Sequence, residues 1–373
     1  MTDAPAYPGQ PLSEVLTPAL IVDLDALDHN LARMARLAKE AGVRLRPHGK
    51  MHKSADLARL QMAHGAVGLC CQKVSEAEAF ARAGVTDLLV TNEVRGAARI
   101  ARLTALAATG AHVGVCVDDP ANVPELSSAI TAAGATLDVY VERDIGQGRC
   151  GVTSTADVVT LARAIDAAPG LSFAGLQAYH GNAQHLPTHA ERSAAIDAAL
   201  PLVAEAVSAL RDICLPPPQV TGAGSGTFPA EAASGLYTEL QCGSYAVLDV
   251  DYARLLDAND SRYDATWRHA VFVLTEVMSV TRPGLAVLDA GHKAHAIDSG
   301  LPVIADRPDL RVTGASDEHT TVDDPASTLA VGDRLRLIPG HCDPTFNLHD
   351  WIVACRGDTV AELWPVTARG CQW

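Results

Sequence analysis

The chain has 373 residues, an apolar share of 48% and a formal net charge of −15. This length allows two domains, or one barrel with an appendage, and the negative charge argues against a nucleic-acid or anionic-membrane partner. The N-terminus lacks the basic and apolar regions of a signal peptide, no uninterrupted apolar stretch approaches a membrane span, and nine cysteines without a CxxC pair indicate a reducing, cytoplasmic compartment.

Strand-like and alanine-rich helical runs alternate over the first two thirds of the chain. Predicted strands are residues 21–24, 44–48, 68–71, 87–92, 112–118, 137–143, 173–180 and 219–222. Predicted helices are residues 26–41, 76–83, 95–108, 123–133, 156–168 and 189–210, and several end at a glycine, which is a stop signal. Eight such strands predict an α/β fold of the (β/α)8 TIM-barrel type. A doubly wound open sheet is the rival, but no GxGxxG follows the first strand.

The pattern changes after about residue 260, where helical stretches become rare. Strand-like, β-branched runs cover residues 270–280, 285–288, 310–312, 334–338, 351–353 and 360–365. We therefore predict a barrel over residues 17–260 and an all-β domain over residues 261–373, with residues 1–16 packing on the β domain.

The second predicted strand carries an unusual basic face. Arg44, Arg46, His48 and Lys50 share one parity, so in an extended segment their side chains point the same way. Burying them unpaired is costly, so they must meet anions, water or a cofactor. Crowding by cations favours the neutral amine that forms a Schiff base. A solvated edge strand with a basic face explains this segment equally well.

Polar residues gather where the predicted strands end, which is the working face of such a barrel. The clearest anion-binding run is Thr221-Gly222-Ala223-Gly224-Ser225-Gly226-Thr227, after the eighth predicted strand. Its glycines let backbone N–H groups converge on a phosphate, and its hydroxyls add donors. An ordinary glycine-rich loop is the alternative. A reactive lysine together with a phosphate cradle indicates pyridoxal 5'-phosphate.

Further runs carry a resemblance to a known family. They are Arg46-Pro47-His48-Gly49-Lys50-Met51-His52-Lys53, Cys70-Cys71-Gln72-Lys73-Val74-Ser75-Glu76-Ala77, Gly146-Gln147-Gly148-Arg149-Cys150-Gly151, Gly175-Leu176-Gln177-Ala178-Tyr179-His180-Gly181, Tyr237-Thr238-Glu239-Leu240-Gln241-Cys242-Gly243-Ser244-Tyr245 and Pro339-Gly340-His341-Cys342-Asp343-Pro344-Thr345. With these runs the chain resembles the D-threonine aldolases and D-serine dehydratases, which are fold-type III pyridoxal-phosphate enzymes with the alanine racemase barrel.

The resemblance implies roles for residues of the barrel. Lys50 would be the Schiff-base lysine, and Arg149 would face the phenolic oxygen of the cofactor. Gln241 would stand where alanine racemases have an arginine opposite the pyridine nitrogen. Phosphate contacts would come from backbone around Gly222, Gly224, Ser225 and Gly226 and around Gly243, Ser244 and Tyr245. Lys53 is interpreted as a surface charge, or as a charge next to the residues that contact the cofactor. A homodimer is also implied.

His341-Cys342-Asp343 is a candidate metal site. In an extended segment His341 and Asp343 face one side while Cys342 points away. An imidazole nitrogen and a carboxylate oxygen suit Mn²⁺ or Mg²⁺. The related dehydratases have a cysteine in place of Asp343, which favours Zn²⁺, so Zn²⁺ stays an option. In isolation, a turn with a solvated aspartate explains the triplet as well.

The resemblance and Asp343 together favour retro-aldol cleavage of a D-configured β-hydroxy-α-amino acid, of the D-threonine or β-hydroxyaspartate type, to glycine and an aldehyde. His185 is the candidate base and Tyr179 a substrate-steering residue, whereas His180 is expected to pack or to hydrogen-bond. The runs at 49–54, 74–81 and 298–302 are most similar to bacterial β-hydroxyaspartate aldolases. A dehydratase forming a 2-oxo acid and ammonia, or a non-enzymatic cofactor carrier, are the alternatives. A racemase would need a tyrosine base, and none follows Tyr263.

Overall fold

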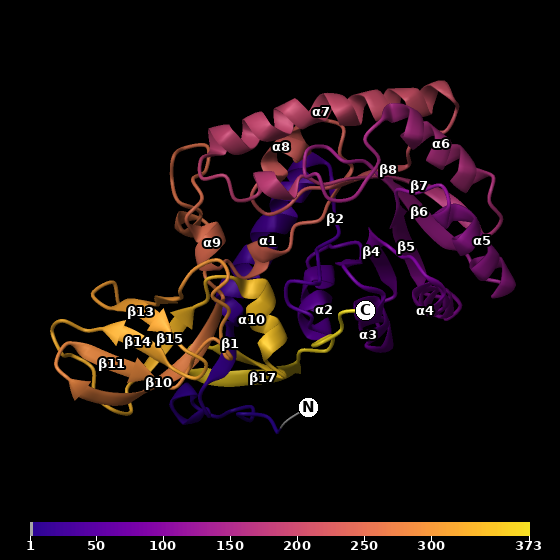
Figure 1. The fold of residues 1–373 in the computed structure, drawn as a ribbon. Coiled ribbons are helices and arrows are strands. Elements are labelled where there is room, and N and C mark those ends of the chain that lie inside the picture. The colour runs from indigo at the N-terminus through magenta and orange to yellow at the C-terminus, as the bar shows by residue number, and fades with distance from the viewer. Residues whose placement is uncertain (1–2) are drawn as a thin grey trace. The chain divides into compact units, whose positions relative to one another are not determined.

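The structure is a computed structural model that describes residues 3–373 and divides into two compact units (Figure 1). The barrel unit comprises residues 34–50, 57–243 and 371–373, and the β unit comprises residues 3–33, 51–56 and 244–370. Residues 17–33 and 244–260, which the sequence analysis places in the barrel, group with the β unit in this division.

The barrel unit is built on a parallel sheet of eight strands in the order β2-β9-β8-β7-β6-β5-β4-β3. A parallel backbone bridge between His48 and Cys70 joins β2 to β3 and closes the sheet. The strands are β2 (Arg44–Leu45), β3 (Leu69–Cys71), β4 (Asp87–Glu93), β5 (His112–Val117), β6 (Leu137–Glu142), β7 (Leu171–Ala178), β8 (Gln219–Gly222) and β9 (Glu239–Leu240). The predicted barrel is thereby confirmed.

One predicted barrel strand is wrong, and one barrel strand was missed. The segment predicted as the first strand is β1 (Ala19–Asp23), which pairs with β10 and β16 of the β unit. The true last strand, β9, was missed because two residues are too short to show any periodicity. The run predicted as the eighth strand is β8, and it pairs with β7 and β9.

Helices alternate with the strands. They are α1 (Leu24–Ala41), α2 (Ala55–Ala63), α3 (Val74–Arg82), α4 (Ala97–Ala107), α5 (Asn122–Ala132), α6 (Thr155–Asp166), α7 (His189–Asp212) and α8 (Phe228–Ala233). The six predicted helices end within two residues of their predicted ends, whereas α2 and α8 were not predicted. The glycines at positions 42, 84, 110, 134 and 170, which follow α1 and α3–α6, all have positive φ. These are the left-handed caps expected of a residue without Cβ.

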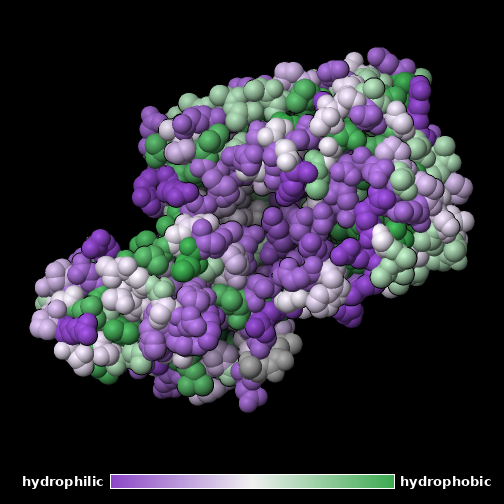
Figure 2. All heavy atoms as spheres, viewed as in Figure 1, coloured by the Kyte–Doolittle hydropathy of each residue, from purple (hydrophilic) through white to green (hydrophobic). Residues whose placement is uncertain are grey.

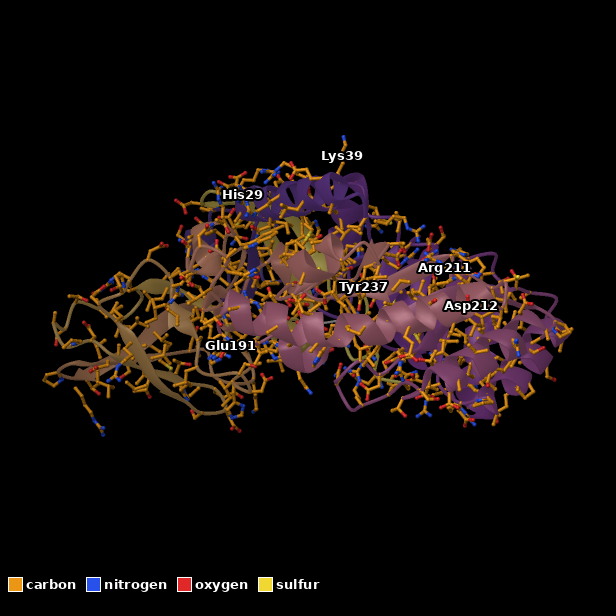
Figure 3. All side chains as sticks on the ribbon, turned by 90° about the horizontal axis from the view of Figure 1, so that it is seen from above. His29, Lys39, Glu191, Arg211, Asp212 and Tyr237 are labelled. Atoms are coloured by element: carbon orange, nitrogen blue, oxygen red, sulfur yellow. The ribbon has the colours of Figure 1, made fainter. Side chains whose placement is uncertain are left out.

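Helix α7 is the longest element of the barrel unit. By length and composition alone it could cross a membrane, which is weak evidence because core helices of soluble proteins pass the same test. Its buried apolar residues recur every three or four positions, as in a helix that packs along one face: Ile196, Ala199, Val203, Ala206, Val207 and Leu210. Glu191 lies near its start and Arg211 near its end, which complements the helix dipole (Figure 3).

The β unit contains a sheet in the order β13-β14-β11-β10-β1-β16-β17, and β15 pairs with both β10 and β12. Strand β1 is antiparallel to β10 and parallel to β16. Besides β1, the strands are β10 (Val271–Arg282), β11 (Leu285–Leu288), β12 (Val303–Ile304), β13 (Arg311–Ala315), β14 (Thr320–Asp323), β15 (Arg334–Ile338), β16 (Trp351–Arg356) and β17 (Thr359–Pro365). The unit also contains two short helices, α9 (Val250–Ala253) and α10 (Cys342–Leu348). Helix α10 departs from the all-β character predicted for residues 261–373, whereas α9 precedes that range.

Each unit has its own apolar core. In the β unit a cluster around Ile21, Phe272 and Val353 joins β1, β10 and β16. In the barrel a smaller cluster includes Cys70 and Cys116. All nine cysteines are free, and most are buried. On the face shown in Figure 2, hydrophilic residues gather around β2 and β4. The side chains of a functional site are therefore expected at the strand ends and not in these two apolar cores.

Candidate functional site

Three predicted cofactor residues and the predicted substrate-steering residue Tyr179 lie at the carboxyl ends of barrel strands. Lys50 follows β2, Tyr179 follows β7, Gly222 is the last residue of β8, and Gln241 follows β9. Because the strands are parallel, these ends belong to the same side of the sheet. The backbone N–H of Gln241 donates to the carbonyl of Gly222 at 2.7 Å, so these two residues are direct neighbours.

Lys50 lies on a tightly held loop. Its backbone N–H lies 3.4 Å from His48 Nδ1, and His48 Nε2 lies 3.0 Å from Thr91 Oγ1. A Cβ on Gly49 would lie 2.6 Å from Leu69 Cδ2, so that position has no room for a side chain. The Lys50 side chain is half-buried, and its Nζ forms no hydrogen bond or ion pair with residues 3–373. A fixed backbone with an available amine suits covalent attachment of an aldehyde.

The basic face predicted beside Lys50 is compensated by a buried carboxylate. Arg46 Nε lies 3.1 Å from Glu239 Oε1, and Arg44 Nη2 lies 3.0 Å from Glu239 Oε2. Arg46 Nη1 also lies 2.5 Å from Asp87 Oδ1. Burial lowers the pKa of Arg46, but the negative charges of Glu239 and Asp87 raise it, so the pKa of Arg46 lies above its usual value. The prediction that these groups meet anions is confirmed for Arg44 and Arg46, and β9 supplies the buried anion. These paired charges crowd Lys50 less than bare cations would.

A chain of buried hydrogen bonds connects Glu239 to Gln241. Thr221 Oγ1 donates to Glu239 Oε1 at 3.1 Å, and Gln241 Nε2 donates to Thr221 Oγ1 at 2.9 Å. Gln241 Nε2 also donates to Gln177 Oε1 at 2.8 Å, and Gln177 Nε2 donates back to Gln241 Oε1 at 3.1 Å. Both amide hydrogens of Gln241 are used, while its carbonyl oxygen can accept one more bond. Neutral partners thus hold Gln241 in one orientation. Its place opposite the pyridine nitrogen stays a prediction.

The glycine run after β8 has the backbone shape of an anion cradle. Ala223 has φ 67°, a left-handed conformation rare outside glycine and suited to turning successive N–H groups toward one anion. A Cβ on Gly222 would lie 2.0 Å from a backbone oxygen of β7, and one on Gly224 would lie 2.3 Å from Gln184 Oε1. The N–H of Gly226, a predicted phosphate donor, is already bound to Gln184 Oε1 at 3.1 Å. The N–H of Gly226 is therefore already used within the protein, and phosphate binding by the donors near Gly224 stays a prediction.

Three buried side chains that the sequence analysis did not assign hold the end of this run. Gln184 Nε2 donates to Thr227 Oγ1 at 2.7 Å, and Thr227 Oγ1 donates to Glu231 Oε1 at 2.7 Å. Arg192 Nε donates to the carbonyl of Gly226 at 2.7 Å. Burial raises the pKa of Glu231 to about 7. The fact that Gln184 immediately precedes the candidate base His185 in the sequence was the only available signal for this network.

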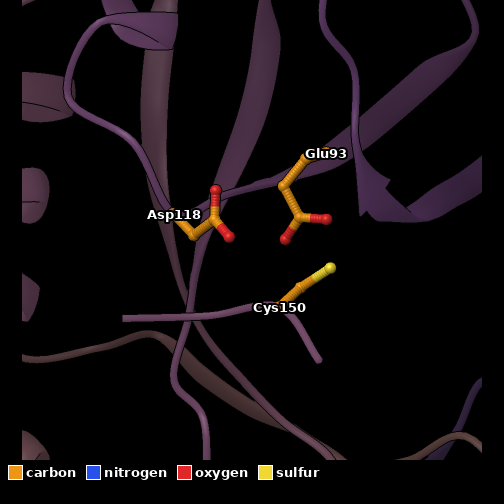
Figure 4. A group of neighbouring side chains, drawn as sticks. All are labelled: Glu93, Asp118 and Cys150. Atoms are coloured by element: carbon orange, nitrogen blue, oxygen red, sulfur yellow. The ribbon is translucent and has the colours of Figure 1, made fainter. Parts of the chain in front are cut away.

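An acidic cluster lies at the ends of β4, β5 and β6 (Figure 4), and the charge of Arg149 acts on its member Glu142. One donor atom each from Glu93, Asp118 and Cys150 lie within 4.8 Å of one another. Burial, with the charge of Glu93, raises the pKa of Glu142 to about 9, and the same two causes raise that of Cys150 to about 11. Glu142 therefore favours its protonated form at neutral pH, and its carboxyl is hydrogen-bonded to Glu93. Arg149 itself is exposed and partly offsets the negative charge of the cluster.

The candidate base and its neighbours follow β7. Tyr179 and His180 are half-buried, and His185 is exposed after the short 3-10 helix Gly181–Ala183. Burial lowers the pKa of His180. A Cβ on Gly146 would lie 2.7 Å from His180 Nε2, so His180 is a packed residue, which is one of the two roles predicted for it. The roles of His185 as base and Tyr179 as steering residue stay predictions.

The chain passes from one unit to the other between Gly243 and Ser244. The carbonyl of Ser244 accepts the N–H groups of residues 247 and 248, and the ring of Tyr245 packs edge-on against Trp267 with centroids 6.0 Å apart. Ser225 is buried in the glycine run. Phosphate binding by Ser225 and by the segment 243–245 stays a prediction.

Lys53 is not the surface charge that its position suggested. It is buried, has φ 51°, and its Nζ donates to Asn347 Oδ1 at 3.1 Å within the β unit. Its backbone carbonyl accepts the N–H of Ala368. A left-handed, anchored lysine is a structural part of the β unit and lies outside the barrel unit that contains Lys50.

The predicted metal pair lies in the β unit, at the start of α10. His341 has extended backbone and directly precedes the helix, whose first turn contains Asp343. His341 Nε2 lies 3.8 Å from Asp343 Oδ2. Two donors that each lie about 2.1 Å from one ion are roughly 3 to 3.5 Å apart, so a small adjustment lets this pair share an ion. The donor set therefore fits a divalent metal, although the extended-segment argument for it was wrong.

The helical turn also changes the place of Cys342. The predicted orientation, away from the pair, is wrong, because the thiol donates to Asp343 Oδ2 at 3.4 Å. Its backbone N–H donates to Asp249 Oδ2 at 2.8 Å. Burial raises the pKa of the Cys342 thiol well above its usual value and also raises that of Asp249. Cys342 therefore stays a protonated neighbour of Asp343 at neutral pH.

Comparisons with known proteins cover both units. Residues 22–249 match the alanine racemase N-terminal domain, and residues 270–355 match a serine dehydratase domain. A 3-hydroxy-D-aspartate aldolase of Paracoccus denitrificans is 53% identical over 370 residues, which are 99% of this chain and 96% of that protein. The crystal structure of D-threonine aldolase from Filomicrobium marinum matches with a TM-score of 0.96 and 49% identity, over 99% of this chain and 100% of that one.

The D-threo-3-hydroxyaspartate dehydratase of Delftia sp. is less similar. Its structure matches with a TM-score of 0.85 and 28% identity, over 98% of this chain and 100% of that one. One variant of that enzyme has a histidine replaced by alanine. A second variant has alanine in place of a cysteine two residues further along, and its structure is in a metal-free form. That spacing equals the spacing of His341 and Asp343.

Proposed function

The chain belongs to the pyridoxal-phosphate enzymes with an alanine racemase-type barrel, among the aldolases of D-configured β-hydroxy-α-amino acids, and we propose that its substrate is 3-hydroxy-D-aspartate. The products would be glycine and glyoxylate. The Cα–Cβ bond breaks, the β-hydroxyl loses its proton and becomes the aldehyde carbonyl, and Cα gains a proton. No water or redox partner is consumed.

The barrel residues would hold the cofactor and the substrate. Pyridoxal phosphate, when bound, supplies an electron sink for the carbanion left at Cα. Lys50 would hold the aldehyde carbon of the cofactor, and N–H groups near Gly224 would bind its phosphate. Arg149 would face the phenolic oxygen of the cofactor. The nearby carboxyl groups of Glu93 and Glu142 would partly offset the positive charge of Arg149. His185 would take the proton of the β-hydroxyl.

His341 and Asp343 would hold a divalent ion that polarises the β-hydroxyl. The observation that carries the aldolase proposal is the carboxylate at position 343, 3.8 Å from His341 Nε2. An imidazole with a carboxylate favours harder ions such as Mn²⁺ or Mg²⁺, whereas an imidazole with a thiolate favours Zn²⁺. Such an ion would supply Lewis acidity toward a hydroxyl group, and His185 would accept the hydroxyl proton.

Two observations support 3-hydroxy-D-aspartate over D-threonine. The identity to the 3-hydroxy-D-aspartate aldolase is 53%, slightly above the 49% to the D-threonine aldolase of known structure. The resemblance of the runs at 49–54, 74–81 and 298–302 to β-hydroxyaspartate aldolases, given in the sequence analysis, points to the same substrate. The margin is small, so D-threonine is the second candidate, and its products would be glycine and acetaldehyde.

The test is product identification with purified protein. It would be incubated with each 3-hydroxyaspartate isomer, D-threonine and D-serine, in Mn²⁺, Mg²⁺ or chelator. We expect glycine and glyoxylate from a D-configured 3-hydroxyaspartate, and loss of activity with chelator. A 2-oxo acid and ammonia without glycine would establish a dehydratase. Full cofactor occupancy without turnover of any substrate would establish a cofactor carrier.

We also propose that the enzyme is a cytoplasmic homodimer. This proposal rests on the resemblance to fold-type III enzymes and on the free cysteines. Light scattering coupled to size-exclusion chromatography measures the mass in solution. A mass of about 39 kDa, that of one chain, would contradict the dimer.

A further inference from the structure

We propose that Asp298 is a positioning residue for the metal pair and orients His341 so that its Nε2 faces the ion. Asp298 lies in the run 298–302, to which the sequence analysis assigned no chemical role. The inference rests on the metal-binding part of the proposed function. It adds Asp298, which is distant from His341 in the sequence and determines which imidazole nitrogen of His341 is available to a metal.

The geometry separates the two nitrogens of His341. Nδ1 lies 2.7 Å from Asp298 Oδ2, whereas Nε2 lies 3.8 Å from Asp343 Oδ2. The first distance is that of a hydrogen bond, and a carboxylate can only accept it, so Nδ1 carries the hydrogen. In the neutral imidazole, Nε2 then keeps its lone pair for a metal. Asp343 is on the side of the ring that Asp298 leaves open.

Two glycines bring Asp298 to His341. Gly300 has φ 116°, and its N–H donates to the carbonyl of Ile297 in a tight turn. A Cβ on Gly340 would lie 2.2 Å from the carbonyl oxygen of Gly300, so the two backbones touch directly. Each glycine is within two residues of one partner of the Asp298–His341 contact. This backbone packing gives a physical reason why both positions are glycine.

Other groups hold the backbone around His341, and Asp298 holds its imidazole ring. Thr345 Oγ1 donates to the carbonyl of His341 at 2.7 Å, and Asp249 Oδ2 accepts the N–H of Cys342 at 2.8 Å. These bonds hold the start of α10. Among the described residues, Asp298 is the only one whose side chain hydrogen-bonds to the imidazole.

A purely structural role does not explain the contact. The side chain of Asp298 is 55% exposed and that of His341 is 29% exposed. Ion pairs with this much exposure contribute little to stability, because water screens them. A carboxylate that orients a metal-binding histidine has a larger effect on the metal, since losing such a partner weakens metal affinity about 10- to 100-fold.

The first measurement is Mn²⁺ affinity by titration calorimetry of the cofactor-loaded protein. We expect the Kd of Asp298→Asn to rise about 10- to 100-fold over wild type, because the neutral amide can also donate and no longer imposes one tautomer. Asp298→Glu should recover part of this loss. Asp309→Asn is the matched control, since Asp309 is an exposed aspartate of the same unit that pairs with Arg307. It should leave the Kd within twofold of wild type.

The second measurement is the tautomer of His341 in metal-free protein, by long-range ¹⁵N–¹H NMR at a pH where the ring is neutral. We expect hydrogen on Nδ1 in wild type and a larger fraction on Nε2 in Asp298→Asn. An unchanged Kd in Asp298→Asn, or hydrogen on Nε2 in wild type, would overturn the inference. So would equal Mn²⁺ binding by His341→Ala and wild type. If the affinities and tautomer change as expected but no glycine forms from any substrate, the proposed function fails while the role of Asp298 stands.

Discussion

The two candidate sites of this protein are built in different ways. The anion cradle of the barrel unit is made of backbone, which a left-handed Ala223 and crowded glycines shape and buried Gln184, Arg192 and Glu231 support. The metal pair of the β unit is made of two partly exposed side chains and one orienting carboxylate. Damage to the barrel network should therefore lower cofactor binding and stability together, whereas damage to the metal pair should lower metal affinity alone.

Loss of the covalent anchor should have the largest effect. Lys50→Ala should abolish the visible absorbance of lysine-bound cofactor and all glycine formation, because no other amine is expected to replace it. Absorption spectra before and after dialysis measure this. Lys53→Arg is the control, since arginine keeps the charge and forms no Schiff base. Persistence of the absorbance in Lys50→Ala, with loss in Lys53→Arg, would assign the anchor to Lys53.

Removal of the buried carboxylate of the barrel should be the next largest effect. Glu239→Gln removes the fully buried carboxylate that pairs with Arg46, which then keeps only the partly exposed Asp87, and should reduce the free energy of unfolding by about 3 kcal/mol. Urea denaturation followed by circular dichroism measures it. Asp87→Asn should cost less, because Asp87 is 36% exposed and Glu239 remains. Equal losses in the two variants would show that Glu239 is not the principal partner.

Glu231 should make the barrel unit sensitive to pH. Its pKa is about 7 in the folded protein against 4.5 when free, so the folded state favours the protonated form. This stabilisation is complete below about pH 4.5 and is lost as pH rises through 7, on the order of 3 kcal/mol in total. Glu231→Gln should therefore lose less stability between pH 5 and about 8 than wild type does. Parallel pH dependence of the two melting temperatures would contradict the burial argument.

Crowding of the anion cradle should have the smallest effect. Gly224→Ala places a Cβ 2.3 Å from Gln184 Oε1 and should weaken pyridoxal-phosphate binding by about 1 to 3 kcal/mol. Fluorescence titration of the cofactor measures it. Gly314→Ala is the control, because a Cβ there meets no atom within 4 Å. Unchanged cofactor affinity in Gly224→Ala would mean that the glycine run does not hold the phosphate.

Much of the barrel could be predicted from local patterns. The glycine stops at positions 42, 84, 110, 134 and 170 are local, because a left-handed cap depends on one residue. Strand β9 and the pairing of β1 with β10 and β16 could not be predicted in this way. Two residues show no periodicity, and an apolar strand fits either of two sheets equally well.

The sequence by itself determined the chemistry that is available: Lys50 at a strand end, a glycine run after β8, and a histidine and an aspartate two residues apart. Its motifs also identified the family, since they recur in order along nearly the whole chain. Only the tertiary structure decided the partners. Glu239 compensates two arginines 195 and 193 positions away, and Asp298 reaches His341 across 43 positions, because pairing of strands and packing of glycines set these contacts. Long-range contacts of this kind leave no local pattern in the sequence. Here they decide that the two arginine charges are compensated and that Nε2 of His341 is available for a metal.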